Sequence, residues 1–171
     1  TYFVSRIKDK DENSTLLNGT WACKFSTEVC SPDGNVFVRT KITDKENKII
    51  YQSPEDLKPT RISQEEETYL NEFAIGLKNQ KIYKVTEEFS IKNPILWDVE
   101  NPYLYTTTTE LLNSKGEIID TYSQNTGFKT AIFDKEQGFF LNGRYLKIFG
   151  ACHHHDHGAL GSAFDKNALR R

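Results

Sequence analysis

The sequence predicts an all-β protein with the architecture of an immunoglobulin-like antiparallel β-sandwich. Short runs of alternating apolar and polar residues recur at intervals of roughly ten residues, and turn residues separate them. Before Ala163 no run has the spacing of an amphipathic helix longer than about two turns. Consecutive strands joined by short turns, without helices between them, favour two packed antiparallel sheets.

In the first half of the chain, alternation predicts strands that turn residues separate. Ser-Pro-Asp-Gly at 31–34 predicts a turn, because proline fixes φ and glycine tolerates the conformation that follows. Residues 53–67 contain two prolines and many charges, so we expect a long loop there. The strand at 20–29 has one face made by every second residue: Trp21, Cys23, Phe25 and Thr27. The strands expected in this half span residues 2–7, 20–29, 36–43 and 48–52.

The second half continues the same pattern. Residues 104–112 include a run of threonines, which are β-branched and disfavour a helix. Residues 94–102 are bounded by prolines and are expected to be irregular. Residues 162–171 are expected to begin a helix, with Asp165 as its N-cap. The strands expected in this half span residues 69–75, 82–91, 104–112, 118–124, 131–133 and 139–141.

Composition narrows the class of protein. The 171 residues are enough for one domain with a proper core. Lysine and arginine number 22 against 24 acidic residues, so we predict neither a nucleic acid nor a membrane surface as partner. No apolar run approaches the roughly 18 residues that cross a bilayer. The odd set of Cys23, Cys30 and Cys152 does not predict a disulfide framework, and Cys23 could pair with Cys30 only if the fold brings them together.

The stretch 138–161 concentrates the residues best suited to chemistry. Asn142-Gly143 predicts a tight hairpin, because both central residues of a type I′ turn need positive φ. Residues 145–149 then alternate as a strand. Polar residues that follow an apolar strand stand where many folds place their active sites. Here they include all four histidines of the chain: His153, His154, His155, Asp156 and His157.

Four segments resemble, in the same order, the signature of glycoside hydrolase family 2, which contains β-galactosidases, β-glucuronidases and β-mannosidases. Residues 94–105 read P-x-L-W-x-x-x-N-P-x-L-Y, and residues 127–130 read GFKT. Residues 138–150, with GFFLNG followed by LKIFG, resemble the entry into the family's catalytic barrel. Residues 150–156, GACHHHD, are most similar to the galactosidase-like members.

The resemblance implies an architecture in which a jelly roll comes first, an immunoglobulin-like sandwich second and a catalytic TIM barrel third. We therefore expect residues 1–134 to form the immunoglobulin-like domain. Residues 135–171 are expected to form a linker hairpin and the first strand and helix start of the barrel of a longer parent. Packing against the jelly-roll and barrel domains of the same chain follows from this arrangement.

The resemblance also implies a β-galactosidase parent that hydrolyses with retention through two glutamates, one an acid/base and the other a nucleophile. No glutamate of this chain matches either catalytic motif, so we expect both to lie beyond Arg171 and this fragment to be inactive. Glu87, Glu88 and the acidic run at 65–67 are interpreted as solvated charges. No cofactor is expected in this chain, whereas the resemblance allows Mg²⁺ or a monovalent cation in the parent. A signal peptide in the parent would indicate a periplasmic or secreted location, and its absence a cytoplasmic one.

Substrate-binding roles follow from the resemblance at two positions. His154 matches the family's N-x-H histidine, which holds the sugar through its hydroxyls, and Asp156 matches a neighbouring acidic or histidine position. Barrel active sites lie at the C-terminal ends of strands, so we expect both side chains to contact carbohydrate there. Cys152 and His155 differ from the asparagine and glutamate that many members carry, which leaves the identity of the sugar open.

Other interpretations of these residues remain open. His153 and His155 fall on one side of a strand and, with His157, could hold zinc, which would make the chain an immunoglobulin-like binding module with a metal site. The histidines could also simply cap the strand end. Aromatic residues of the signature segments could stack on a sugar, although packing is the commoner role: Trp97, Phe128, Phe139, Phe140 and Tyr145.

Overall fold

The computed structural model describes residues 2–10, 19–64, 66, 81–150, 161 and 166–170. The expected strand at 69–75 and the expected N-cap Asp165 lie outside these residues. No helix in the described part is long and apolar enough to cross a membrane. The elements are β1 (Tyr2–Lys10), β2 (Gly19–Cys30), β3 (Val36–Thr43), β4 (Ile49–Gln52), β5 (Thr60–Arg61), β6 (Ile82–Lys92), β7 (Tyr105–Asn113), β8 (Ile118–Thr126), β9 (Ala131–Asp134), β10 (Gly138–Leu141), β11 (Arg144–Tyr145) and α2 (Lys166–Leu169).

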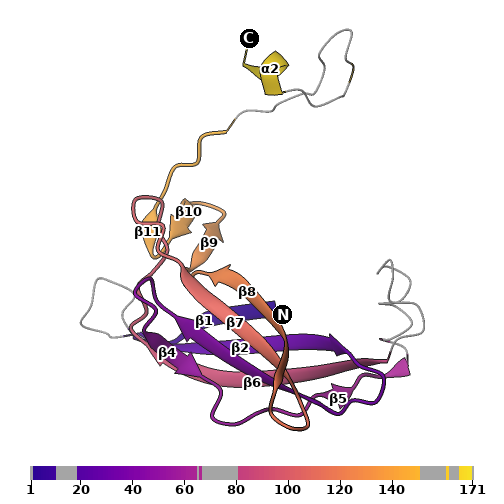
Figure 1. Cartoon of the computed structure of the whole chain (residues 1–171). Coiled ribbons are helices and arrows are strands. Elements are labelled where there is room, and N and C mark those ends of the chain that lie inside the picture. The colour runs from indigo at the N-terminus through magenta and orange to yellow at the C-terminus, as the bar shows by residue number, and fades with distance from the viewer. Residues whose placement is uncertain are drawn as a thin grey trace.

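Two four-stranded sheets make the body of the protein (Figure 1). Their strand orders are β1-β2-β6-β5 and β4-β3-β7-β8, and all neighbouring strands are antiparallel. In immunoglobulin notation the first order corresponds to A-B-E-D and the second to C′-C-F-G. The predicted immunoglobulin-like antiparallel sandwich is therefore confirmed. A small third sheet, β11-β10-β9, lies at one end of the sandwich (Figure 1).

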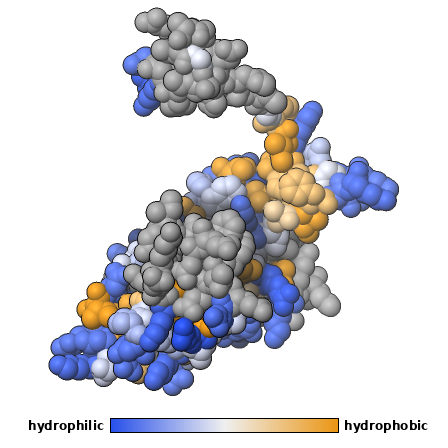
Figure 2. Space-filling view, turned by 90° about the vertical axis from the view of Figure 1, so that its right-hand side faces the viewer, coloured by the Kyte–Doolittle hydropathy of each residue, from blue (hydrophilic) through white to orange (hydrophobic). Residues whose placement is uncertain are grey.

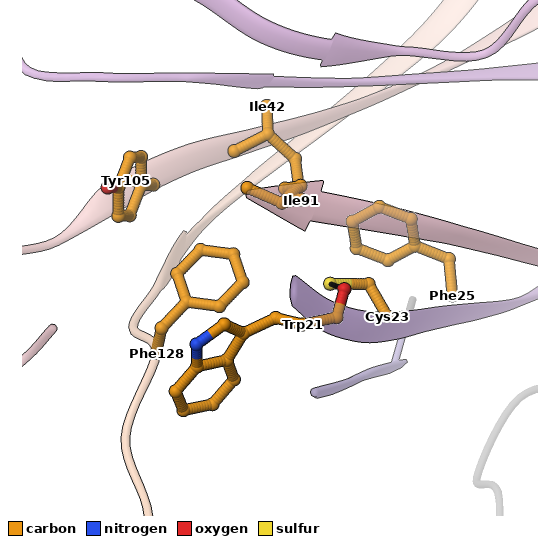
Figure 3. Close-up of a cluster of buried hydrophobic side chains, with 7 residues drawn as sticks. All are labelled: Trp21, Cys23, Phe25, Ile42, Ile91, Tyr105 and Phe128. Atoms are coloured by element: carbon orange, nitrogen blue, oxygen red, sulfur yellow. Dashed lines mark hydrogen bonds between the residues drawn. The ribbon is translucent and has the colours of Figure 1, made fainter. Parts of the chain in front are cut away.

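The core lies between the two large sheets because every second residue of their central strands faces inward. The predicted inner face of β2 is buried throughout, from Trp21 to Thr27. Figure 3 shows how residues from four strands and one loop meet in the main cluster: Trp21, Cys23, Phe25, Ile42, Ile91, Tyr105 and Phe128. Burying each large apolar side chain contributes roughly 1.5–3 kcal/mol, so this cluster is a principal source of stability.

The predicted hairpin at Asn142-Gly143 is confirmed, with φ of 51° and 75° at its two central residues. The strand predicted over 145–149 is wrong in extent. Only Arg144–Tyr145 pairs, with β10, and residues 146–150 contain no strand. A strand needs a neighbour for its backbone groups. Leu146 N still donates to Phe139 O of β10 at 2.9 Å, but none of the described strands pairs with residues 147–150.

The segment 53–67, expected to be a loop, contains short stretches of β-sheet pairing that its composition does not predict. Thr60–Arg61 pairs with β6 as a two-residue strand, and Leu57 forms a bridge to Val38 of β3. Prolines 54 and 59 flank that bridge and keep the segment from forming a longer ladder. The segment therefore ties the edges of both sheets together despite its loop-like sequence.

Candidate functional site: the junction at one end of the sandwich

Three segments that are far apart in the sequence meet where the small sheet joins the sandwich. They are the loop at 94–102, residues 127–130, and the turn between β10 and β11. Trp97 N donates to Phe128 O at 2.8 Å, and Leu96 forms a parallel bridge with Phe128. We call this meeting point the junction. It brings together three of the four segments that carry the family resemblance.

Asn142 fastens the junction through both ends of its side chain. Its Nδ2 donates to Trp97 O at 2.9 Å, and its Oδ1 accepts from Thr130 N at 3.0 Å. Its own backbone N donates to Thr130 O at 2.9 Å. Asparagine suits this turn position because it tolerates the left-handed conformation better than most residues do. The turn therefore also connects the small sheet to the sandwich.

Each residue of the Gly-Phe-Lys element has a separate structural task. A Cβ on Gly127 would lie 3.3 Å from Trp97 Cβ, which is tight enough that Trp97 would have to move by a few tenths of an ångström. Phe128 is fully buried. Lys129 Nζ lies 4.9 Å from the centre of the Trp97 ring, a cation–π contact.

Phe128 lies at the centre of an aromatic cluster that extends into the core. Its ring makes edge-to-face contacts with Phe3, Trp21 and Tyr105, with centroids 5.2–5.8 Å apart. The Trp21 indole nitrogen has no hydrogen-bond partner among the described residues, and Figure 3 shows it on the side that faces Phe128. Burial raises the pKa of the Tyr105 hydroxyl, which also accepts a hydrogen bond from Ile95 N at 2.7 Å. Phe128 therefore packs and is not available to stack on a sugar.

The remaining signature aromatics contact one another on the small sheet. Phe139 packs on Phe133 at 4.7 Å, and Phe140 meets Tyr145 edge-on at 5.9 Å. Phe139 and Phe140 are half-buried, whereas Tyr145 is exposed. Packing is thus the observed role of these side chains.

Charged groups support the junction from the solvent side. Arg144 Nη2 donates to Asp98 Oδ1 at 2.8 Å, and Arg144 Nη1 donates to Glu100 Oε1 at 3.3 Å. The hydrogen bond to Glu100 and the charges of both acids raise the pKa of Arg144. Surface ion pairs contribute little individually, but this one spans the hairpin and the 94–102 loop. The sequence pattern gave no signal for these partners, since an arginine after a turn is ordinary.

The predicted sugar-contacting residues His154 and Asp156 lie outside the described residues. The same holds for His153, His155 and His157 of the zinc hypothesis, and for Cys152. Residues 146–150 lead toward them from the hairpin, and Figure 1 shows this segment leaving the sandwich at the junction end. Among the described residues no group of three His, Cys, Asp or Glu side chains could hold a metal ion.

Glu87 corrects one expectation from the sequence. It is buried between the sheets, where it accepts hydrogen bonds from the Tyr51 hydroxyl and from Ser53 Oγ, the latter at 2.9 Å. Its neighbour Glu88 is exposed and pairs with Lys24 at 2.9 Å, as expected for a solvated charge. Adjacent strand residues face opposite sides, so only one of two consecutive glutamates can be solvated here. Tyr51 and Ser53 provide the polar partners that a buried carboxylate needs.

Cys23 and Cys30 are both free, so the fold does not pair them. Cys23 is buried in the core, and this burial raises its pKa to about 12. Cys30 is exposed at the end of β2.

The chain is similar to known proteins over most of its length. Residues 6–129 match the family described as Glycosyl hydrolases family 2. A beta-galactosidase from Bacteroides ovatus is 43% identical over 50% of this chain and 10% of its own length. A beta-galactosidase from Thermoanaerobacterium thermosulfurigenes is 32% identical over 81% of this chain and 16% of its own. A putative beta-glucuronidase from Formosa agariphila is 39% identical over 48% of this chain and 8% of its own.

Solved structures share the fold. A glycosyl hydrolase family 2 member from Bacteroides cellulosilyticus superposes with a TM-score of 0.62 at 24% identity, over 94% of this chain and 19% of that one. A beta-glucuronidase from Bacteroides uniformis gives a TM-score of 0.65 at 21% identity, over 98% and 18%. The chain thus spans about a fifth or less of the length of these relatives. With a family match that covers well over half of its residues, this chain belongs to glycosyl hydrolases family 2.

Proposed function

We propose that this chain braces the catalytic barrel of a longer retaining glycoside hydrolase, and that the longer protein cleaves terminal β-D-galactosides. The observation that carries the proposal is the junction. The residues that resemble the family signature meet there through Asn142, Trp97 and Phe128. The chain continues from the junction toward His154 and Asp156. In the proposed protein these two side chains contact the sugar at the mouth of the barrel.

An apolar surface beside the junction supports a neighbouring domain as its partner. Phe133 of β9 is 77% exposed and Phe149 is 83% exposed, and Ile132 and Ile148 are also exposed. Figure 2 shows hydrophobic colouring gathered around the small sheet and the segment that leaves it. Large apolar side chains exposed close together mark an interaction site in soluble proteins. We assign it to packing against the barrel of the same chain.

This interface has a test of its own. Phe133→Ser should lower the melting temperature of the longer protein by more than that of the 171-residue chain, where the exposed side chain loses only its contact with Phe139. Ile118→Ser, which removes an exposed apolar side chain from β8, is the matched control. Equal effects of Phe133→Ser on both proteins would contradict the assignment.

The chemistry is proposed to come from two glutamates of the longer protein, one as acid/base and one as nucleophile. The described glutamates of this chain offer no such pair. Glu87 is enclosed between the sheets by Tyr51 and Ser53. The 171-residue chain should therefore hydrolyse nothing by itself.

β-Galactosides are favoured as substrates because the beta-galactosidase from Bacteroides ovatus is more similar to this chain than the Formosa agariphila protein is. The difference is 43% against 39% identity over similar spans, which makes glucuronides the main competitor. Glucuronides carry a carboxylate that galactosides lack, so one assay separates the two.

The test is the hydrolysis of aryl β-galactoside, β-glucuronide and β-mannoside by the 171-residue chain and by the longer protein. We expect the longer protein to cleave the galactoside and the short chain to cleave none. Replacing His154 by alanine in the longer protein should lower kcat/KM for the galactoside by about tenfold or more, because the variant loses a hydrogen bond to the substrate. Activity confined to the glucuronide would overturn the choice of sugar. An inactive longer protein would overturn the proposed activity.

A further inference from the structure

The outer face of the sheet β1-β2-β6-β5 carries a charged depression that the junction does not use. It has a volume of about 630 Å³, which falls within the range of small-molecule sites. Residues from three adjacent strands line it, among them Val4, Arg6, Lys8, Ala22, Lys24 and Glu88. None of these residues takes part in the contacts of the junction described above.

The strand register explains why these side chains share one face. Arg6 lies opposite Ala22, and Lys24 lies opposite both Val4 and Glu88 on its two sides. The intervening residues Trp21 and Cys23 face the core, so their neighbours along the strand must point outward. Ala22 is small and is surrounded by longer side chains, which makes the hollow.

The charges in the depression are unbalanced. Lys24 pairs with Glu88 at 2.9 Å. Arg6 and Lys8 are exposed, and neither forms an ion pair with another residue of the described part of the chain. Three cations therefore surround one carboxylate, in a protein whose overall charge is −2. The local excess is positive and attracts an anion.

We propose that this depression binds an anionic carbohydrate, a sugar whose ring carries a carboxylate. Arg6 and Lys8 hold the carboxylate, since the guanidinium fork matches carboxylate geometry. Glu88 and Ser90, which lies opposite Ala22, bond the hydroxyls. Val4 and Ala22 provide an apolar floor for the C–H face of the ring.

The carboxylate of Glu88 argues for a sugar acid over a phosphate ligand. A phosphate is charged on every side and would be repelled by Glu88. A sugar acid keeps its charge at one end, against Arg6 and Lys8, and its neutral hydroxyls donate to Glu88. The chain also lacks the extended basic surface that nucleic acid needs. The site is independent of the proposed hydrolysis, because the 171-residue chain contains it whole.

The test is a calorimetric titration of the 171-residue chain with three probes. Tetragalacturonate carries a carboxylate on each ring, galactotetraose is its neutral counterpart, and tetraglutamate has the charge without the sugar. We expect binding of tetragalacturonate only, weakened by added salt. Equal binding of tetraglutamate would overturn the proposal in favour of an acidic peptide. No binding of tetragalacturonate would also overturn it.

Variants locate the site and separate its two chemistries. Arg6→Ser should weaken tetragalacturonate binding about tenfold, whereas Lys115→Ser, an exposed lysine in the β7–β8 turn, should not change it. Glu88→Ala is the discriminating variant. The variant removes an acceptor for the sugar hydroxyls, so the affinity for tetragalacturonate should fall about threefold or more if the site recognises a sugar. If the site recognises charge alone, the affinity should rise, because a repelling carboxylate is gone. Tighter binding by Glu88→Ala, or unchanged binding by Arg6→Ser, would contradict the assignment. Circular dichroism confirms that each variant is folded.

Discussion

The side-chain amide of Asn142 donates to the backbone carbonyl of Trp97 at 2.9 Å, across a sequence separation of 45 residues. One residue thus connects the hairpin of the small sheet to the loop that precedes β7. Because the same side chain accepts from Thr130 N, neither of the two segments can move without breaking a hydrogen bond. Rigidity of this kind is what a domain needs if it is to hold a catalytic neighbour in place.

Replacing Asn142 by alanine should destabilise the chain by about 2 kcal/mol, measured by urea unfolding. The variant loses two side-chain hydrogen bonds. It also places alanine at a φ of 51°, a left-handed conformation that alanine adopts less readily than asparagine does. Asn142→Gly is the matched control, since glycine accepts this φ and lacks only the amide. We expect it to lose about 1 kcal/mol. If Asn142→Gly were as stable as the unmodified chain, the amide contacts would have no energetic role.

Gly127→Ala tests the close approach of the two signature segments. The new Cβ would lie 3.3 Å from Trp97 Cβ and 3.4 Å from Leu104 Cδ2, so Trp97 must shift. Overpacking of this type costs about 1–3 kcal/mol, and the near-ultraviolet dichroism of Trp97 should change with it. Gly150→Ala, where no heavy atom lies within 4 Å of the added Cβ, should leave both stability and spectrum unchanged. Identical spectra for the two variants would contradict the tight contact between residue 127 and Trp97.

Much of this fold follows from local pattern. The alternation in β2 and β3 predicts strands of the sandwich, because one buried face imposes a period of two. The turn at Asn142-Gly143 predicts the hairpin of the small sheet. The junction is harder to predict. The motif residues Trp97 and Phe128 are visible in the sequence, but nothing local shows that a turn asparagine bonds to Trp97 O and to Thr130 N.

Two expectations from the sequence were wrong, for reasons that local pattern does not show. Consecutive glutamates read as a charged surface, yet the strand places Glu87 inside, where Tyr51 and Ser53 provide its partners. Residues 146–150 alternate like a strand, but alternation does not supply a neighbour to pair with. Both cases depend on contacts between distant parts of the chain.

Thiol reactivity should distinguish the two cysteines described here. In a Cys152→Ser background at pH 8, one thiol should react promptly with a disulfide reagent such as Ellman's reagent, and that thiol is Cys30. Cys23 should react only after unfolding, because it is buried and its pKa is raised to about 12, which leaves little thiolate. Cys30→Ser in the same background should abolish the prompt reaction. Prompt reaction of both thiols in the folded chain would contradict the buried position of Cys23.

The Tyr51–Glu87 hydrogen bond predicts a specific loss of stability at alkaline pH. Burial, followed by the hydrogen bond to Glu87 and its charge, raises the pKa of Tyr51 above its ordinary value of 10.0. The Tyr51 hydroxyl therefore contributes its full stabilisation below pH 10. As the pH rises from there through the folded-state pKa, the contribution is lost, because Tyr51 releases its proton at lower pH in the unfolded chain than in the folded one. Tyr51→Phe should cost about 1–2 kcal/mol at pH 7 in urea unfolding, since Glu87 loses a donor. Between pH 9 and 11 the difference in free energy of unfolding between the unmodified chain and Tyr51→Phe should narrow. Tyr122→Phe, at an exposed tyrosine, is the control for other effects of alkaline pH on stability. A gap that stays constant with pH would mean that the Tyr51 hydroxyl titrates alike in the folded and unfolded chains.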